Sequence, residues 1–531
     1  MNDNETVAAV LETTATRKMN GHLPNAVDLS HHLNLLSRSR HPSPLKDIIK
    51  FMGYDGMISL AGGLPHPSLF PVYDASFTVS APSPTADSLE IKLSNDSGET
   101  PPLSKFLQYG TCTGNAELRQ WCLDFTRQIH RPAYKDFDVL LHPGNTNAWS
   151  KVVGLLCEKG DYILCESYTY PSSQALWIPN DNFAAPVAMD GEGITDTALE
   201  EILSTWDATH PGVKRPHVLY LVSVGSNPTG VSMGSERRRK IYEICVKYDV
   251  IIVEDDPYYF LQYPEIDTSG TPTEYTSTSN KEFLSSLVPS FLRFDRQGRV
   301  IRLESFSKTL APGLRLGYFV ANPLFTERLL RATEVETQDP SGLSQALVLA
   351  LLTRWSRDGY ITWLQNLRLE YQRRRDWMVA ALRKSFDLAP ASEYPELSGA
   401  EGGLVAAILG PNGSRVPVFS FIAPTGGMFI WTKFYFGHNA KYLALKNAAV
   451  EVDPEQIFAN KLWAELAEER VLLTPGYYYH PWQGADKTST TARGADPDSS
   501  HFRLAFSMTT KDDMELGIER MANVIRRSWS P

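Results

Sequence analysis

The chain is poor in cysteine for its length, with five cysteines among 531 residues: Cys112, Cys122, Cys157, Cys165 and Cys245. No two of them form a C-x-x-C pair, and their number is odd. Disulfide-dependent secreted domains carry more cysteines, and zinc sites usually show close cysteine pairs. We therefore expect neither a disulfide framework nor a metal site, and a reducing compartment such as the cytoplasm fits best.

The sequence also lacks a membrane span, an excess of positive charge and a recognisable targeting segment. No apolar run approaches the ~20 residues that cross a bilayer. The first residues, MNDNETVAAVLETTATRK, have neither the basic and apolar regions of a signal peptide nor the composition of a transit peptide. Lysine and arginine total 51 against 61 aspartate and glutamate residues, a formal net charge of -10. Because phosphate backbones bind basic surfaces, we expect a protein that binds neither nucleic acid nor membrane.

What remains is the composition of an ordinary globular protein, 42% hydrophobic and 21% charged. At roughly 150 residues per domain, the length suggests two to four domains, or one large α/β unit with a smaller one attached. Residues 1–40 are polar and weakly patterned, so we interpret them as a partly flexible arm, with ordered sequence beginning near residue 41. Four stretches rich in Ser, Thr, Pro or Gly are expected to be insertions or surface loops: residues 75–102, 264–285, 387–417 and 484–500.

Between these stretches, strand and helix patterns alternate along the chain. Apolar runs predict strands at residues 162–167, 217–224, 250–256 and 300–307, and helical spacing predicts helices around 149–157 and after Ser235. This order implies an α/β fold with a largely parallel sheet and helices on both faces. Ligands of such sheets bind beyond the carboxyl ends of the strands, where several polar motifs of this chain lie.

The strand predicted at 300–307 runs into Ser305, Ser307 and Lys308, and Arg315 follows the lysine seven residues later. In a closed site, desolvation and nearby cations lower the pKa of a lysine, which can then form a Schiff base with an aldehyde. The hydroxyls and the guanidinium are donors suited to a phosphate. The alternative is a solvated surface lysine and arginine, which one short motif does not exclude.

The strand predicted at 250–256 ends in three adjacent acidic residues, Glu254, Asp255 and Asp256, followed by Pro257 and two tyrosines, Tyr258 and Tyr259. A carboxylate at a strand end can hold a protonated pyridine nitrogen and so keep a pyridoxal ring cationic. Tyr259, three residues after Asp256, can donate to the phenolate oxygen of that ring. A turn opened by Asp-Pro is an equally good interpretation of this motif by itself.

Two more motifs stand where a strand ends and where a helix begins. Asn227, in Ser-Asn-Pro-Thr-Gly, lies in a predicted tight turn, and its amide can point toward the same phenolate oxygen. Asn145 and Thr146 follow a glycine at the start of a predicted helix. Such a helix start binds anions through backbone N–H groups, although both residues can equally be plain N-caps.

Arg503 lies near the C-terminus in the strand-like run His-Phe-Arg-Leu-Ala-Phe-Ser. An arginine in apolar surroundings favours a carboxylate that it can bind through two hydrogen bonds. That carboxylate belongs either to a ligand or to a structural ion pair.

The five motifs occur in the order found in fold-type I pyridoxal-phosphate aminotransferases of class I/II, which the sequence closely resembles over about residues 41–525. Residues 58–65 (ISLAGGLP), 107–110 (LQYG) and 254–263 (EDDPYYFLQY), with SFSK, resemble the branch of aromatic-amino-acid and kynurenine/2-aminoadipate aminotransferases. The total length and the insertions look like the fungal aromatic aminotransferases.

This resemblance implies the cofactor, pyridoxal 5'-phosphate, and the residues that hold it. Lys308 would carry the cofactor as an imine and later shuttle the proton, and Asp256 would pair with the pyridinium nitrogen. Arg503 and the backbone at Gly63 would hold the substrate α-carboxylate. The other implied cofactor contacts are Asn227 and Tyr259 at the ring oxygen, Tyr170 stacked on the ring, Asn145, Thr146, Ser305, Ser307 and Arg315 at the phosphate, and Tyr109 at the phosphate of the neighbouring subunit of a homodimer with shared active sites.

The resemblance also implies a three-layer fold with a mostly parallel central sheet in a large domain and a smaller α+β domain. We expect a polar arm at residues 1–40, a segment at 41–100 that contributes to the small domain and to dimer contacts, a large cofactor-binding domain at 101–345 and a small domain at 346–531. The implied activity moves the amino group of an aromatic L-amino acid to 2-oxoglutarate, or to another 2-oxo acid, by a ping-pong mechanism.

Four alternatives stand beside this hypothesis. A 2-aminoadipate or kynurenine aminotransferase, or a pyridoxal-phosphate lyase or decarboxylase, needs the same cofactor contacts. A transcriptional regulator of this fold carries an N-terminal winged helix, for which residues 1–40 are too short and too little basic. A catalytically inactive scaffold is disfavoured because each expected catalytic residue is present.

Overall fold

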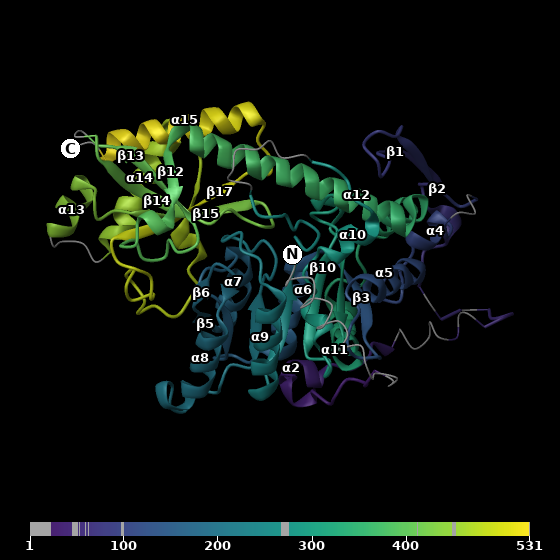
Figure 1. Cartoon of the computed structure of the whole chain (residues 1–531). Helices are drawn as coiled ribbons and strands as arrows, with labels where there is room; N and C mark the ends of the chain where they lie inside the picture. Colours follow the sequence, from purple (N-terminus) through teal and green to yellow (C-terminus); the bar gives the residue numbers. More distant parts are fainter. Residues whose placement is uncertain are drawn as a thin grey trace, which may run out of the picture.

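The structure is a computed structural model of the chain. It describes residues 23–44, 51, 54–58, 60–61, 63–96, 100–266, 275–410, 413–448 and 453–529. A seven-stranded sheet and a six-stranded sheet organise these residues (Figure 1). Buried apolar clusters pack against each sheet. The predicted α/β fold, with a mostly parallel central sheet and a smaller second unit, is confirmed.

The seven-stranded sheet has the order β3-β11-β10-β9-β8-β4-β5. Strand β11 is antiparallel to both of its neighbours, and the successive pairs from β10 to β5 are parallel. The carboxyl ends of β8, β9 and β10 therefore meet at one edge of the sheet. The strands are β3 (Asp138–His142), β4 (Tyr162–Glu166), β5 (Phe183–Val187), β8 (Val218–Leu221), β9 (Ile251–Asp255), β10 (Val300–Ser305) and β11 (Gly317–Ala321).

Helices cover both faces of this sheet, and the strand residues alternate between two buried clusters. Ile252 packs in the cluster with helices α5, α8 and α9, whereas Ile251 and Val253 pack in the cluster with α6 and α11. This two-residue period decides which side chains near the strand ends share a face. The helices are α4 (Leu103–Phe106), α5 (Ala116–Ile129), α6 (Asn145–Leu156), α7 (Pro171–Trp177), α8 (Asp196–Thr209), α9 (Ser235–Lys247), α10 (Asn280–Ser285) and α11 (Pro323–Glu336).

The six-stranded sheet is antiparallel, with the order β12-β13-β14-β15-β17-β16. The long helix α12 (Gly342–Ser385) joins it to the larger unit and leaves helical geometry at Ser356, where φ is 61° (Figure 1). The remaining elements of the smaller unit are β12 (Asp387–Pro390), β13 (Leu404–Leu409), β14 (Arg415–Phe421), β15 (Phe429–Tyr435), β16 (Thr474–Pro475), β17 (Ser499–Ala505), α13 (Ala440–Asn447), α14 (Pro454–Glu468) and α15 (Lys511–Trp529).

Two of the stretches expected to be loops contain strands, so the loop prediction was wrong there. Residues 75–102 include most of the hairpin of β1 (Asp74–Val79) and β2 (Leu89–Ser94), with Ile91 and Leu93 buried. Residues 387–417 include β12, β13 and the start of β14. Turn-forming residues flank these short strands and hide their period. In the stretch 264–285, residues 267–274 lie outside the described residues and α10 occupies the end, so the loop prediction was also wrong at 280–285; the stretch 484–500 is mainly turns.

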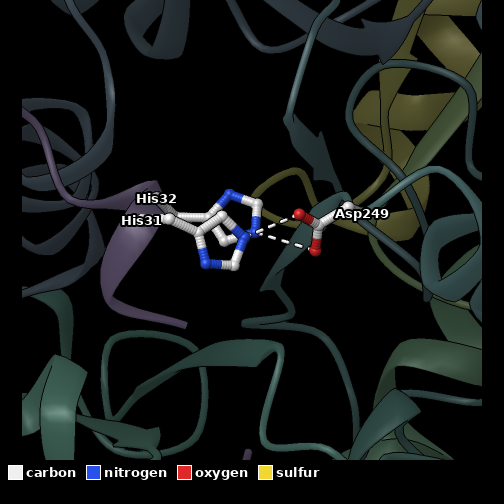
Figure 2. Close-up of side chains that lie close together, drawn as sticks. All are labelled: His31, His32 and Asp249. Atoms are coloured by element: carbon white, nitrogen blue, oxygen red, sulfur yellow. Dashed lines mark hydrogen bonds and ion pairs between the residues drawn. The ribbon is translucent and has the colours of Figure 1, made fainter. Parts of the chain in front are cut away.

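The described part of the expected arm, residues 23–40, packs against the seven-stranded unit instead of extending from it. Leu29 and Leu33 are buried in the cluster that contains α6. The sequence did not reveal these two apolar contacts because the arm is polar in overall composition. His31 and His32 both contact the carboxylate of Asp249 through Nε2, at 2.6 and 3.0 Å (Figure 2). Ordered chain therefore begins before residue 41, and residues 1–22 lie outside the described part.

No helix in the described part of the chain combines the length and the apolar character that crossing a bilayer requires.

Candidate active site

A cavity of about 370 Å³ lies at the carboxyl ends of β8, β9 and β10 and extends to the six-stranded sheet. The larger unit supplies most of its lining, and Phe429 on β15 and Arg503 on β17 complete it. The structure thus brings together most of the residues predicted from sequence: Asn145, Thr146, Tyr170, Asn227, Ser305, Ser307, Lys308, Arg315 and Arg503.

Lys308 follows the end of β10 and lines this cavity. Burial lowers the pKa of its ammonium, and the positive charges of Arg503 and Arg315 lower it further. Both effects favour the neutral amine, the form of lysine that acts as a nucleophile and as a base.

Hydroxyl, guanidinium and helix-terminal donors gather beside Lys308. Arg315 donates from Nη1 to Ser307 Oγ at 3.4 Å and from Nη2 to the carbonyl of Pro143 at 3.2 Å. Ser305 Oγ donates to Ser307 Oγ at 2.9 Å. Helix α6 begins next to them without a side-chain cap, so its first N–H groups are available to an anion.

Gly144 precedes α6 with φ of +96°, and it is the residue that lets Arg315 approach. A Cβ atom at this position would lie 2.0 Å from Arg315 Nη2. The missing side chain therefore leaves space for a guanidinium at the start of a helix, an arrangement that suits a phosphate.

Asp255 is the last residue of β9, and its carboxylate lines the cavity. The hydroxyl of Tyr220 donates to Oδ2 at 2.7 Å, and Asn145 Nδ2 donates to Oδ1 at 2.6 Å. Burial raises the pKa of this carboxyl, whereas the two hydrogen bonds act in the opposite direction. Tyr258, three residues later, also lines the cavity.

The prediction that Asp256 and Tyr259 contact the cofactor was wrong, because both residues lie on the opposite side of β9. Asp256 Oδ2 accepts hydrogen bonds from Ser223 Oγ at 3.1 Å and from Arg302 Nη1 at 3.3 Å. The guanidinium of Arg302 lies 4.7 Å from the centre of the Tyr259 ring. Since side chains alternate along a strand, one residue decides between the cavity and the core, and the motif contains two adjacent candidates.

Asn145 lines the cavity, but its side chain does not reach toward the proposed phosphate position. Besides Asp255, its Nδ2 donates to the carbonyl of Leu303 at 3.0 Å, so both amide hydrogens are used. At this residue only the backbone N–H is left for an anion, whereas the neighbouring Thr146 lines the cavity as predicted.

Arg503 and Asn227 contact each other in the lining of the same cavity. Arg503 donates from Nη1 to Asn227 Oδ1 at 2.6 Å and from Nη2 to Thr474 Oγ1 at 3.3 Å. Its guanidinium lies 4.2 Å from the centre of the Phe429 ring. These partners are neutral oxygens and an aromatic ring, so the positive charge of Arg503 is available to a carboxylate.

Three further predicted residues divide between the cavity and the surface. Tyr170 precedes α7 and lines the cavity. Gly63 and Tyr109 are exposed and lie outside the lining; Tyr109 is 64% exposed. A single chain does not bring these two residues to the other site residues.

Sequence reasoning missed Asp255, Tyr258 and Tyr220. Counting the two-residue period from Ile251 and Val253 would have placed Asp255 with the face that packs on α6. Tyr220 was visible as the one hydroxyl-bearing residue in the apolar core of the run 218–222. A polar group inside a buried strand requires a partner, which was the available signal.

Comparison with known proteins gives consistent results. Residues 102–521 match the family of class I and II aminotransferases. An aromatic amino acid aminotransferase of Schizosaccharomyces pombe is 35% identical over 517 residues, covering 94% of this chain and 98% of the relative. An L-tyrosine:2-oxoglutarate aminotransferase of Serpula lacrymans is 34% identical, covering 87% and 85%. The crystal structure of an aminotransferase from Candida albicans superposes with a TM-score of 0.82 at 32% identity, covering 95% and 99%.

Proposed function

Because this chain belongs to the class I and II aminotransferase family and is an aminotransferase, we propose that it binds pyridoxal 5'-phosphate and transfers the amino group of an aromatic L-amino acid to 2-oxoglutarate or another 2-oxo acid. The observation that carries this proposal is the lysine of lowered pKa in a cavity that also holds a buried carboxylate, an anion site and a separate arginine.

The cavity fits the cofactor on the chemistry of its donors. The space that Gly144 leaves for Arg315, with Ser305, Ser307 and the first N–H groups of α6, suits a phosphate. Asp255 offers a buried carboxylate to a cationic ring nitrogen. Asn227 and Tyr258 line the same cavity and would contact the ring oxygen through an amide and a phenol, and Tyr170 would offer an aromatic face to the ring.

When bound, the cofactor supplies an electron-poor ring that accepts the electron pair of the broken Cα–H bond. The protein residues position the substrate and move the proton. Arg503 binds the α-carboxylate of the amino acid and so orients its Cα–H bond. Lys308 Nζ, whose ammonium has its pKa lowered by burial and by the two arginines, removes the α-proton and later returns it.

The aromatic donor is proposed from relatives and from the lining. The relatives of S. pombe and S. lacrymans are named for aromatic amino acids and for tyrosine with 2-oxoglutarate. Trp149, Tyr170, Tyr258 and Phe429 give the cavity aromatic surface that suits such a side chain. Kynurenine and 2-aminoadipate remain alternative donors, and a lyase remains the alternative reaction.

A homodimer with shared sites is part of the proposal. Tyr54, Ile58, Leu60 and Tyr73 are exposed apolar or aromatic side chains in the N-terminal segment. Gln108 Nε2 donates to the carbonyl of Pro65 at 2.7 Å, which ties the loop of Tyr109 to that segment. Exposed apolar surface of this kind favours association. In a dimer, Tyr109 would reach the phosphate of the neighbouring site and Gly63 would approach the substrate carboxylate.

The proposed domain division is an arm at 1–40, a segment at 41–100, a large domain at 101–345 and a small domain at 346–531. The seven-stranded sheet falls within the third range and the six-stranded sheet within the fourth, which supports the division. A cytoplasmic location is proposed with it, and cell fractionation tests that point.

Borohydride trapping followed by peptide mapping tests the cofactor site, with the reduced adduct expected on Lys308. A donor panel of phenylalanine, tyrosine, tryptophan, kynurenine and 2-aminoadipate with 2-oxoglutarate then tests the reaction. We expect turnover with the aromatic donors and none in Lys308→Ala. An adduct on another residue, or no change in cofactor absorbance with any aromatic donor, would contradict the proposal. Release of 2-oxo acid without a co-substrate would indicate the lyase instead.

A further inference from the structure

Tyr220 is a buried tyrosine on the central strand β8 whose hydroxyl points to the carboxylate at the end of the next strand. We propose that Tyr220 is a positioning residue that acts with the Asn145 side chain to keep Asp255 ionised, and so to keep the proton on the ring nitrogen of the cofactor. The inference rests on the proposed function and assigns to Tyr220 and Asn145 a role beyond contact with the cofactor.

The geometry gives each oxygen of Asp255 its own neutral donor. Tyr220 donates to Oδ2 at 2.7 Å and Asn145 to Oδ1 at 2.6 Å. In the parallel pair of β8 and β9, Tyr220 stands opposite Val253, and Asp255 is the next residue of β9 on the same face. Both donors thus belong to elements that are fixed relative to Asp255.

Aromatic packing fixes the ring of Tyr220. The ring centroids of Trp149 and Tyr220 are 4.5 Å apart, and Trp149 itself donates to the carbonyl of Ser173 at 3.2 Å. Trp177 lies against the same ring, with centroids 6.3 Å apart. The side chain of Tyr220 is fully buried. A rotation away from Asp255 would leave the hydroxyl and Oδ2 of the carboxylate without this hydrogen bond.

The charge of the donors explains why this arrangement matters. Within the described ranges, no ion pair involves Asp255, and its hydrogen-bond donors are a phenol and an amide. Such donors stabilise the anion without neutralising it. The negative charge therefore remains available to a cation that enters the cavity, and it would raise the pKa of the ring nitrogen and so favour the protonated ring.

A proton shared by a carboxylate and a ring nitrogen lies either on the nitrogen, which gives an ion pair, or on the carboxylate, which gives two neutral groups. The total charge is the same in both forms. Hydrogen bonds to the carboxylate favour the ionic form, in which the nitrogen carries the proton. Removing one donor to a charged group shifts such an equilibrium by about tenfold or more. Tyr220→Phe removes the hydroxyl and keeps the ring, so it isolates this effect from packing.

The experiment reconstitutes the protein with pyridoxal 5'-phosphate labelled with ¹⁵N in the ring and records the ¹⁵N chemical shift. In the wild type we expect the shift of a protonated ring. In Tyr220→Phe and in Asn145→Ala we expect the shift to move toward the unprotonated value, and the dissociation constant of the cofactor to rise. Asn145→Ala leaves β8 untouched, so it tests the inference even if the Tyr220 variant fails to fold.

Tyr242→Phe is the matched control, since the buried hydroxyl of Tyr242 donates to Asp295 outside the cavity lining. Its ¹⁵N shift should equal that of the wild type. An unchanged shift in both Tyr220→Phe and Asn145→Ala would overturn the inference while leaving the proposed function intact. A wild-type protein that does not take up the labelled cofactor at Lys308 would overturn the proposed function, and the inference with it.

Discussion

The two faces of strand β9 hold carboxylates in opposite electrostatic settings. On the cavity face, Asp255 accepts hydrogen bonds from the neutral side chains of Tyr220 and Asn145. On the core face, Arg302 contacts Glu254 at 2.8 Å and Asp256 at 3.3 Å. Three consecutive acidic residues thus divide between a site that preserves negative charge and a cluster that cancels it.

The hydrogen-bond and ion-pair partners of these carboxylates explain why the two faces differ. A buried carboxylate paired with a guanidinium has its charge compensated and serves mainly to join elements. Arg302 also contacts Glu304 at 2.6 Å, and Arg238 contacts Glu254 at 3.0 Å, so the cluster holds β9 and β10 together behind the cavity. A buried carboxylate with neutral donors keeps its charge for a ligand. Partner chemistry therefore separates the acid that we propose to bind the cofactor from the acids that join strands.

The largest effect is expected from Arg302→Met, which leaves Glu254, Asp256 and Glu304 without this cation. Breaking a buried pair from one side costs about 3–5 kcal/mol, so the free energy of unfolding in urea should fall by that amount. Arg315→Met is the matched change on the cavity side. Because Arg315 contacts neutral oxygens, we expect weaker cofactor binding with little loss of stability. Equal stability losses in the two variants would erase the distinction between the faces.

Asp255→Asn should change catalysis instead of stability. The amide cannot stabilise a protonated ring nitrogen, so kcat should fall by about 10²–10³-fold, as for the loss of one pre-organised electrostatic contact. The thermal midpoint should change little, since the variant no longer buries an uncompensated charge. Steady-state kinetics and thermal unfolding measure the two quantities. The comparison fails if Asp256→Asn, rather than Asp255→Asn, produces the kinetic loss.

Asp256→Asn should change stability in a pH-dependent way. Burial raises the pKa of this carboxyl to about 7. An acid whose pKa is raised in the folded state binds more protons there than in the unfolded chain, so its contribution to stability falls as pH rises between about 4 and 7. The Asp256→Asn variant has no ionisable group at this position, so it lacks this decrease in stability. The free energy of unfolding of the variant minus that of the wild type should therefore be larger at pH 8 than at pH 5, by at least about 1 kcal/mol. Urea unfolding at the two pH values checks this, and a larger advantage at pH 5 would reverse the assigned sign.

The smallest effect is expected from the two neighbouring tyrosines. Tyr258→Phe removes a hydroxyl in the cavity lining and should raise the dissociation constant of the cofactor by about tenfold or less, the value of one ordinary hydrogen bond. Tyr259→Phe makes the same chemical change on the core face, where the ring packs on Arg302. Reconstitution titrations should show no change for this second variant. If Tyr259→Phe weakens cofactor binding and Tyr258→Phe does not, then Tyr259 and not Tyr258 contacts the cofactor, and the assignment of the two faces is wrong.

The sequence was sufficient to predict the elements and residues that depend on local pattern. The apolar runs of β8, β9 and β10 and the polar residues after them placed Lys308, Arg315 and Asn227 at one edge of a sheet. The prediction failed where a shift of one residue moves a side chain to the other face of the strand, as at Asp255 and Asp256. It also failed where short strands such as β13 lie among turn residues. The positions of Gly63 and Tyr109 depend on contacts that one chain does not make by itself.

The proposed reactive amine and the proposed carboxylate-binding arginine of the cavity belong to different sheets. Lys308 follows β10 of the larger sheet, Arg503 lies on β17 of the smaller one, and α12 connects the two with its break at Ser356. In the proposed reaction, one substrate molecule therefore bridges two separately packed bodies. A substitution deep in the core of the smaller sheet could slow the reaction solely by altering the distance between these two side chains, with every lining residue unchanged.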